Sequence, residues 1–334
     1  MNKIYGNRFV LETIEAMIDS GRLPHGFVIH GETGLGKKTI ARYIAKTLLC
    51  EKRQSRPCGK CRSCINVTKG IHSDLIIPEQ SGKLMTYTVE TCRKICADAI
   101  IKPNDSDKKI YLFADADNIQ IPAQNSLLKV IEEPPEFVYF IFTVKSRDSF
   151  LPTILSRVIS LAASPCSRDE CAAALAFKGF DSNQISKALS IFGGNIGMSV
   201  KYLENEDLQT IASLTKKATD SIINRDAYSL LVTLSSDILK DRKNAVTFLE
   251  MLDRVIRDAA VVQISGSEEC IGCCPKASML LSERISAASA EKIHNAIAEA
   301  ADDFRANVNS SLIMSGLCGD ILLSLIHISE PTRP

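Results

Sequence analysis

The sequence predicts an α/β fold with a parallel sheet in its N-terminal half and an all-helical remainder, and three observations support this. A glycine-rich loop follows an apolar run at 27–29 and precedes a helical pattern at 40–49. Further β-branched and aromatic runs alternate with helical patterns, which is typical of parallel sheets. From Arg168 onward no run convincingly predicts a strand. A ligand of such a sheet binds at the carboxyl ends of its strands.

The composition is that of an ordinary globular protein. The chain has 334 residues, of which 45% are hydrophobic and 24% charged, so two or three domains with substantial cores are expected. Its net charge of +1 does not demand nucleic acid as a direct partner. No apolar stretch reaches the length of a membrane span, and no signal peptide is evident. We therefore expect a cytoplasmic protein without a membrane partner.

Each predicted element rests on its local pattern. Short β-branched or aromatic runs predict strands, which are expected at 27–29, 75–77, 110–113, 137–143 and 158–161. Apolar stripes at helical spacing predict the helices of the same half, which are expected at 4–22, 40–49, 89–101, 118–133 and 149–157. Short helices are expected at 170–177, 182–191 and 198–203. Beyond Leu208 the pattern is helical to Ile328, most clearly at 227–241, 244–265, 282–300 and 308–326.

The loop at 31–39 has the spacing G-x-x-x-x-G-K of a phosphate-binding loop, or P-loop. Its glycines allow a tight turn with inward N–H groups, the next helix adds the partial positive charge of its N-terminus, and Lys37 can reach phosphates. The residues expected to contact a nucleotide are Gly31, Gly34, Gly36, Lys37, Lys38, Thr39, Asp115 and Thr143. Thr143 could sense a γ-phosphate at its strand end, or be structural. A glycine-rich turn without a ligand is the alternative for the loop.

Two positions that handle Mg²⁺ in P-loop ATPases are altered in this sequence. The residue after the phosphate-binding lysine is Lys38, and Thr39 cannot substitute because one residue along a helix is a rotation of about 100°. At the end of the strand at 110–113, Ala114 takes the place of the metal-holding acid, and Asp115 falls where the water-orienting acid would be. The sequence predicts nucleotide binding better than hydrolysis, with ATP held weakly or not at all.

Twelve cysteines in a chain without an evident export signal predict free thiols or a metal site rather than disulfides. The spacing C-x7-C-x2-C-x2-C is formed by Cys50, Cys58, Cys61 and Cys64. Four thiolates set a tetrahedral Zn²⁺ site without an open coordination position, so the predicted site is structural. Reduced cysteines in a loop are the alternative. Half of a second metal site is suggested by Cys270, Cys273 and Cys274, although no further C-x-x-C lies nearby.

Five features together resemble the delta-prime subunits of the bacterial DNA polymerase III clamp loader, which are AAA+ proteins. They are the P-loop, the four-cysteine module after its helix, the segment 125–135 with its Glu-Glu-Pro-Pro end, the segment 153–157, and the lid-like 193–197. The resemblance covers about residues 4–200. It implies an AAA+ domain at 1–163 with a zinc module at 50–72, a helical lid at 164–206 and a helical collar at 207–323. Residues 324–334 are expected to be a non-native tail.

The resemblance also implies a role for Ser156 and Arg157. In the family, a Ser-Arg-Cys element places an arginine finger in the ATP site of a neighbouring subunit, and Val158 replaces the cysteine here. An arginine finger needs only its guanidinium against developing phosphate charge, so Val158 does not exclude the role. A structural salt bridge is the alternative for Arg157. Met198 stands where the lid of the family carries a second sensing arginine.

The partners implied are clamp-loader subunits of the gamma/tau and delta types in a hetero-oligomeric ring, the sliding clamp, and primed DNA reached through the assembly. The chain would then be a component of the polymerase holoenzyme with little or no hydrolysis of its own. Three alternatives stay open: an active gamma/tau-type ATPase, a P-loop kinase acting on a small molecule, and a zinc scaffold that binds no nucleotide. The kinase is disfavoured by Lys38, Ala114 and the long helical remainder.

Overall fold

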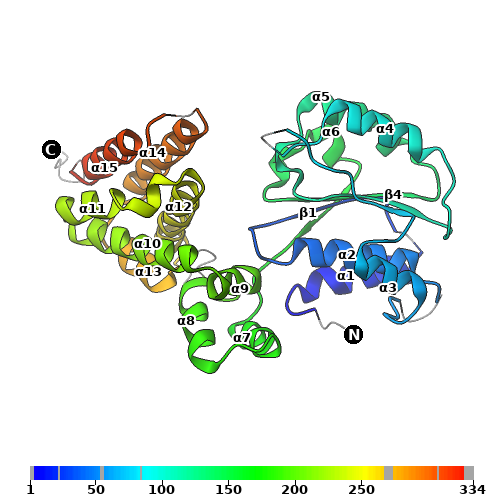
Figure 1. Cartoon of the computed structure of the whole chain (residues 1–334), viewed down its shortest axis with the longest axis horizontal. Coiled ribbons are helices and arrows are strands. Elements are labelled where there is room, and N and C mark those ends of the chain that lie inside the picture. Colours follow the sequence, from blue (N-terminus) through cyan, green and yellow to red (C-terminus); the bar gives the residue numbers. More distant parts are fainter. Residues whose placement is uncertain are drawn as a thin grey trace. The chain divides into compact units, whose positions relative to one another are not determined.

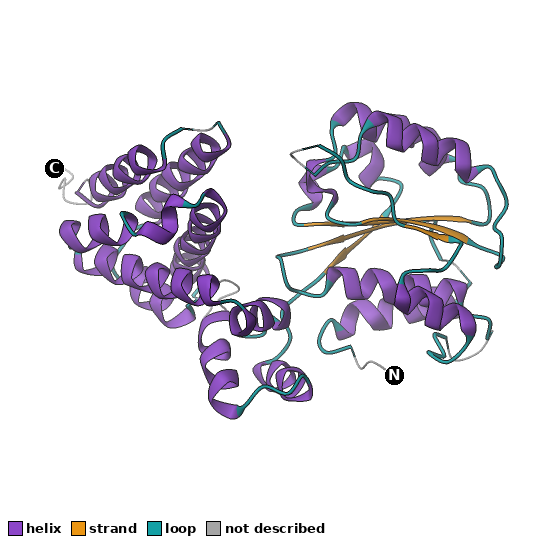
Figure 2. Cartoon of the chain, in the orientation of Figure 1, coloured by secondary structure: helices purple, strands orange, loops and turns teal. Residues whose placement is uncertain are grey.

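The structure is a computed structural model, and it describes residues 4–21, 23–52, 56–82, 85–266, 274–306 and 308–326. The chain forms two compact units, Met1–Cys166 and Ser167–Pro334 (Figure 1). Among the described residues, strands occur only in the first unit, and the second unit is helical (Figure 2). This arrangement confirms the predicted α/β fold class with a helical C-terminal part.

The first unit is built on a sheet of five parallel strands in the order β2-β3-β4-β1-β5. The strands are β1 (Gly26–His30), β2 (Leu75–Ile76), β3 (Lys109–Phe113), β4 (Val138–Val144) and β5 (Ile159–Ala162). Because the strands are parallel, the loops that follow β1, β3 and β4 meet at one edge of the sheet. That edge is where an α/β sheet binds its ligands.

Helices cover both faces of this sheet (Figure 1). One face carries α1 (Arg8–Asp19), α2 (Lys37–Leu49) and α3 (Arg62–Lys69). The other face carries α4 (Val89–Ala99), α5 (Ile121–Glu132) and α6 (Pro152–Leu155). Two short 3₁₀ helices, η1 (Ala116–Asn118) and η2 (Arg147–Ser149), follow β3 and β4.

The strands alternate between two cores because successive side chains of a strand point to opposite faces. Ile110 and Leu112 of β3 belong to the core formed with α1 and α2. Tyr111 and Phe113 of the same strand belong to the core formed with α4 and α5. Burial on both faces explains why these strands are continuous apolar runs rather than alternating patterns.

The second unit consists of helices, and all of its described helices except the first contribute residues to one core. Its helices are α7 (Arg168–Phe177), α8 (Ser182–Phe192), α9 (Ile196–Glu204), α10 (Glu206–Asn224), α11 (Ala227–Leu234), η3 (Asp237–Lys240), α12 (Arg242–Ser265), α13 (Pro275–Ser282), α14 (Ala287–Arg305) and α15 (Ser310–Ile326). Phe248, Leu252 and Val255 of α12 are fully buried in that core. Among the described helices of the chain, none has the length and apolar character needed to cross a membrane.

Three helical predictions differ from the structure. The predicted helix at 282–300 begins only at Ala287, because Ser286 caps it by accepting the N–H of Ser289 at 3.1 Å. The predicted helix at 227–241 ends with Leu234 and continues as the separate η3. Helix α13 lies in the stretch expected to be helical but was not predicted as a separate element; it starts at Pro275, a residue well suited to a first helical turn.

The predicted collar and the predicted lid, apart from residues 164–166, fall within the second compact unit, and their separation stays a prediction. Helix α15 includes residues 324–326, which the predicted tail had contained. Leu325 is buried, and the hydroxyl of Ser289 donates to the carbonyl of Ser324 at 3.0 Å. Residues 327–334 lie outside the described residues.

Candidate functional site: the P-loop edge and the cysteine cluster

The P-loop begins at Gly31, directly after β1. The N–H of Gly31 donates to the carbonyls of Val144 and Lys145 at 3.2 and 3.1 Å, which fixes the loop to the end of β4. Its φ is +141°, and a Cβ at this position would lie 2.6 Å from the carbonyl oxygen of Ala163. Only glycine fits there without movement of the backbone. Gly36 has φ +86° and is the N-cap of α2, so strand, loop and helix follow one another as predicted.

Lys37 lies folded over the loop. Its side chain is only 8% exposed, and its ammonium donates to the carbonyl oxygens of Gly31 and Glu32 at 2.5 and 2.9 Å. Burial lowers the pKa of Lys37, while the carboxylates of Asp117, Asp115 and Glu32 oppose that shift. The lysine predicted to reach phosphate thus lies at the loop, among carboxylates that moderate its attraction for an anion.

Lys38 turns toward the end of β3. Its Nζ lies 2.5 Å from Oδ2 of Asp115, and both side chains are 55% exposed. Thr39 is exposed on the first turn of α2, and its N–H donates to the carbonyl of Gly36 at 2.9 Å. Two residues predicted for the nucleotide site, Lys38 and Asp115, are therefore in direct contact.

Thr143 connects the ends of β3 and β4. It is fully buried, and its Oγ1 accepts the N–H of Asp115 at 2.9 Å. The carbonyl of Ala114 accepts from the amide of Gln80 at 2.9 Å and from the hydroxyl of Tyr87 at 2.7 Å. These contacts hold the backbone after β3 and favour the structural alternative for Thr143. Gln80 and Tyr87 carried no functional signal in the sequence.

Arg157 contacts its own unit rather than the P-loop residues named above. Its Nη2 lies 2.9 Å from Oε1 of Glu132, and its Nη1 donates to the carbonyl of Thr153 and to Oγ of Ser156 at 2.8 and 3.0 Å. The salt bridge considered as an alternative is thus present. No role was predicted from the sequence for Glu132, although this residue lies in the Glu-Glu-Pro-Pro segment.

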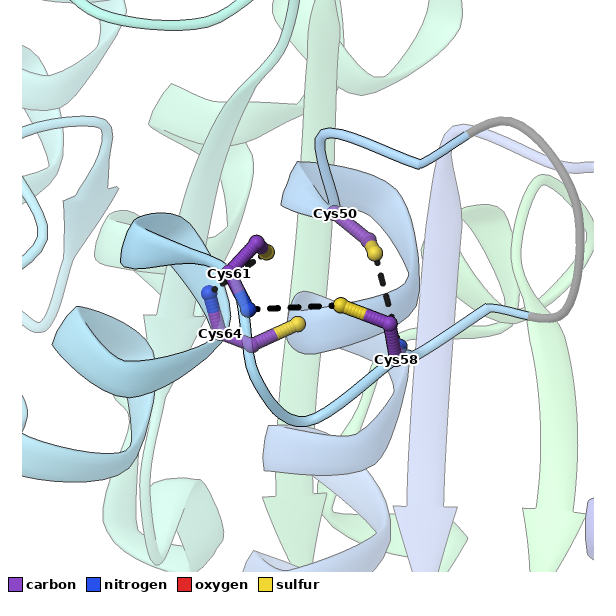
Figure 3. Close-up of side chains that lie close together, drawn as sticks. All are labelled: Cys50, Cys58, Cys61 and Cys64. Atoms are coloured by element: carbon purple, nitrogen blue, oxygen red, sulfur yellow. Dashed lines mark hydrogen bonds between the residues drawn. The ribbon is translucent and has the colours of Figure 1, made fainter.

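The predicted metal ligands form one cluster (Figure 3). The sulfur atoms of Cys50, Cys58, Cys61 and Cys64 all lie within 4.8 Å of one another. Four thiolates around Zn²⁺ would have their sulfurs about 3.8 Å apart, given a Zn–S distance of about 2.3 Å and tetrahedral geometry. The donor set and its spacing therefore fit a metal with little movement.

Backbone N–H groups point at the sulfurs of this cluster. Cys58 donates to the sulfur of Cys50 at 3.5 Å, Cys61 to that of Cys58 at 3.4 Å, and Cys64 to that of Cys61 at 3.4 Å (Figure 3). The N–H groups of Lys60 and Cys61 lower the pKa of Cys58 to about 6, whereas burial raises the pKa of Cys64. N–H donors stabilise thiolates, which are the form that binds a metal.

The suggested second metal site is not seen as a group. Cys270 and Cys273 lie outside the described residues, and Cys274 is buried at the start of α13. Within the described residues, the four-cysteine cluster is the only group of three or more His, Cys, Asp or Glu residues close enough to share a metal ion.

Residues 6–167 match the protein family described as DNA polymerase III, delta subunit. The DNA polymerase III subunit gamma of Buchnera aphidicola subsp. Schizaphis graminum is 34% identical over 158 residues, which are 47% of this chain and 43% of that protein. The gamma subunit of the subspecies Baizongia pistaciae is 29% identical over 73% of this chain and 68% of that protein. The subunit delta′ of Bacillus subtilis is 23% identical over 78% of this chain and 79% of that protein. The chain thus spans less than half of the first relative.

Two solved structures are similar over most of the chain. A gamma subunit-related protein of Thermotoga maritima has 15% identity and a TM-score of 0.43, with coverage of 95% of this chain and 98% of that chain. The DNA clamp loader delta protein of Bacillus subtilis has 9% identity and a TM-score of 0.36, with coverage of 94% and 99%. Likenesses at this level carry no conclusion about function.

Proposed function

We propose that this chain, whose residues 6–167 match the family described as DNA polymerase III, delta subunit, serves as the delta-prime subunit of a DNA polymerase III clamp loader. In this role it assembles with gamma/tau-type ATPase subunits and a delta-type subunit, and it helps the assembly load the sliding clamp onto primed DNA. The observation that carries the proposal is a P-loop whose two Mg²⁺-handling positions are Lys38 and Ala114, combined with a surface arginine in a Ser-Arg element.

The site of the chain itself is expected to be a poor ATPase. Phosphoryl transfer needs Mg²⁺ held by a P-loop hydroxyl and an acidic residue, and an acid or amide that orients the attacking water. Here an ammonium, that of Lys38, occupies the first position, and its partner Asp115 follows Ala114, which stands in the place of the metal-holding acid. The chain keeps a phosphate cradle but lacks the groups that place the metal.

Arg157 is proposed to act on the ATP bound by a neighbouring subunit. Its side chain is 39% exposed, and its guanidinium is held by Glu132, Thr153 and Ser156 near the surface of the unit. An exposed ion pair contributes only about 0–1 kcal/mol, so a more highly charged phosphate group can displace Glu132. The guanidinium would then stabilise the charge that develops on the transferred phosphoryl group.

The cysteine cluster is proposed to hold one structural Zn²⁺ ion. Cys50 follows the end of α2, and Cys61 is the N-cap of α3, so the metal would join these two helices. All four coordination positions would be filled by sulfur, which leaves no place for a reactive water. A structural ion of this kind stabilises a small loop-rich module that buries little apolar surface.

An active gamma/tau-type ATPase is the second candidate, because the relatives with about one third identity are gamma subunits. Steady Mg²⁺-dependent ATP turnover by the isolated chain would support this candidate and contradict the delta-prime role. Turnover at the level of a Lys37→Ala variant would exclude it.

The experiment that tests the proposed role measures ATP turnover by gamma/tau-type subunits assembled with this chain. Arg157→Ala is compared with wild type and with Arg93→Ala, which removes another exposed arginine of the same unit. An arginine finger contributes about a thousandfold or more at the one site it serves, so only Arg157→Ala should abolish turnover at that site. Equal turnover in all three assemblies would show that Arg157 is structural.

A further inference from the structure

The contact between Lys38 and Asp115 lies where P-loop ATPases hold Mg²⁺. In those enzymes the hydroxyl after the phosphate-binding lysine ligates the ion, and an acid at the end of a neighbouring strand holds it from the other side. Here the first element carries Lys38, and the second carries Ala114 in the place of the metal-holding acid and Asp115 next to it. The charged atoms of Lys38 and Asp115 lie 2.5 Å apart. A fixed cation of the chain thus bridges the two elements that otherwise share the metal.

The environment of this ion pair leaves the ammonium available to a ligand. Both side chains are 55% exposed, so Lys38 can turn from Asp115 to an anion without the cost of exposing a buried charge. Lys37, the adjacent residue, already lies over the loop with its ammonium on the carbonyls of Gly31 and Glu32. A phosphate group in the cradle would therefore meet two lysine ammonium groups and the N–H groups that begin α2.

A divalent ion would be poorly accommodated at the same place. It would lie beside the ammonium of Lys38 and would compete with it for Asp115, since Ala114 stands in the place of the metal-holding acid. Like charges at short range repel, and the repulsion is stronger at a partly buried site than in water. A nucleotide without bound Mg²⁺ is also more negative than its Mg²⁺ complex, so it is attracted more strongly by two lysines.

We propose that the P-loop of this chain binds nucleoside di- or triphosphates in their metal-free form, with the ammonium of Lys38 in the place of Mg²⁺. The inference rests on the proposed nucleotide site and specifies its ligand. It also gives the site a reason to be inert, because an ammonium can neutralise phosphate charge but cannot coordinate and align phosphate oxygens as a metal ion does. The nearby carboxylates of Glu32, Asp115 and Asp117 keep the affinity low.

The test is calorimetric titration of the full chain with ADP and with ATP, once in EDTA and once in excess Mg²⁺. Wild type is expected to bind at least about tenfold more tightly in EDTA. Lys38→Ser restores the hydroxyl and should reverse the preference, so that Mg²⁺ strengthens binding. Lys38→Met keeps the bulk without the charge, and should lose binding in EDTA without gaining it in Mg²⁺. Asp115→Asn releases Lys38 and should tighten binding of the metal-free nucleotide.

Two outcomes would overturn the inference. Wild type could bind the Mg²⁺ complex more tightly than the free nucleotide, or it could bind neither, which would mean that the ion pair closes the site. Both residues are half exposed, so the variants are expected to fold, and their cooperative thermal unfolding checks this. The result is independent of the delta-prime role, because that role is tested by Arg157 in the assembled loader and could stand with an empty P-loop.

Discussion

Arg157 and Glu132 form an ion pair in which the guanidinium Nη2 lies 2.9 Å from the carboxylate Oε1. Glu132 is the last residue of α5, where the helix dipole disfavours a negative charge. The guanidinium therefore offsets an unfavourable charge, while the Arg157 side chain remains 39% exposed. One contact thus explains both how Arg157 is held in the isolated chain and why it can be released to a stronger anion.

Glu132→Gln is expected to change the free energy of unfolding by less than about 1 kcal/mol, because exposed ion pairs contribute little. Urea denaturation of the full chain measures this, with Glu133→Gln as the matched control for loss of a carboxylate beside the end of α5. A loss of several kcal/mol confined to Glu132→Gln would mean that the pair is a structural anchor, and would weaken the case for an exchangeable Arg157.

Cys58→Ser and Cys61→Ser are each expected to remove the bound metal from the purified chain. Three cysteines cannot fill a tetrahedral structural site, and the affinity of such a site depends on its thiolates. Elemental analysis should find a single zinc ion per wild-type chain and much less in both variants, with a lower melting temperature. Cys96→Ser, on α4 and outside the cluster, should keep the metal. Equal zinc in all four proteins would refute the assignment of the ligands.

Asp74 is expected to make stability depend on acidic pH. It is fully buried, and burial raises its pKa, but the N–H groups of Asn104, Asp105 and Ser106 outweigh this effect and lower the pKa below its usual value. A lowered pKa in the folded state means that the carboxylate stabilises the fold above about pH 4, the unfolded value. That contribution is lost as the pH falls below it.

Asp74→Asn should therefore lower the free energy of unfolding at neutral pH by about 2 kcal/mol, because buried N–H groups lose a charged acceptor. The difference from wild type should shrink as the pH falls toward and below about 4. Chemical denaturation at a series of pH values measures both quantities. A difference that stays constant down to the lowest pH would show that the charge of Asp74 does not stabilise the loop at 104–106.

Features that depend on short-range pattern could be predicted from the sequence. The glycine spacing of the P-loop predicts a strand, a tight turn and a helix, and Gly31 and Gly36 adopt the positive φ values that such a turn requires. The spacing of the cysteines predicts their clustering, because short C-x-x-C loops bring sulfurs together whatever surrounds them. The apolar runs predict buried strands, and the five strands occur where they were expected.

Contacts between distant segments could not be predicted in the same way. The partner of Lys38 is set by where β3 ends relative to α2, and the partner of Arg157 by how α5 and α6 pack. Helix α13 was not predicted as a separate element because its N-cap Cys274 and its first residue Pro275 have the local pattern of a turn. Leu281 is fully buried in the shared core, so tertiary packing stabilises a helix that its own sequence signals weakly.

Gly31→Ala is expected to destabilise the first unit more than an ordinary glycine substitution at positive φ. A Cβ at Gly31 would lie 2.6 Å from the carbonyl oxygen of Ala163, which is backbone and cannot rotate away. Gly70→Ala is the matched control, because Gly70 has φ +73° but no atom within 4 Å of the added Cβ. The control should lose about 1–2 kcal/mol from backbone strain alone.

Urea denaturation should show a clearly larger loss for Gly31→Ala than for Gly70→Ala, and nucleotide titration should show lost binding only for Gly31→Ala. The reason is that Gly31 donates to Val144 and Lys145, so a shift to relieve the contact with Ala163 would open the loop at its fixed end. If both variants lose the same free energy of unfolding, the backbone at Ala163 can move away from the added Cβ at little cost. The position of the P-loop would then not depend on the short distance between Gly31 and Ala163.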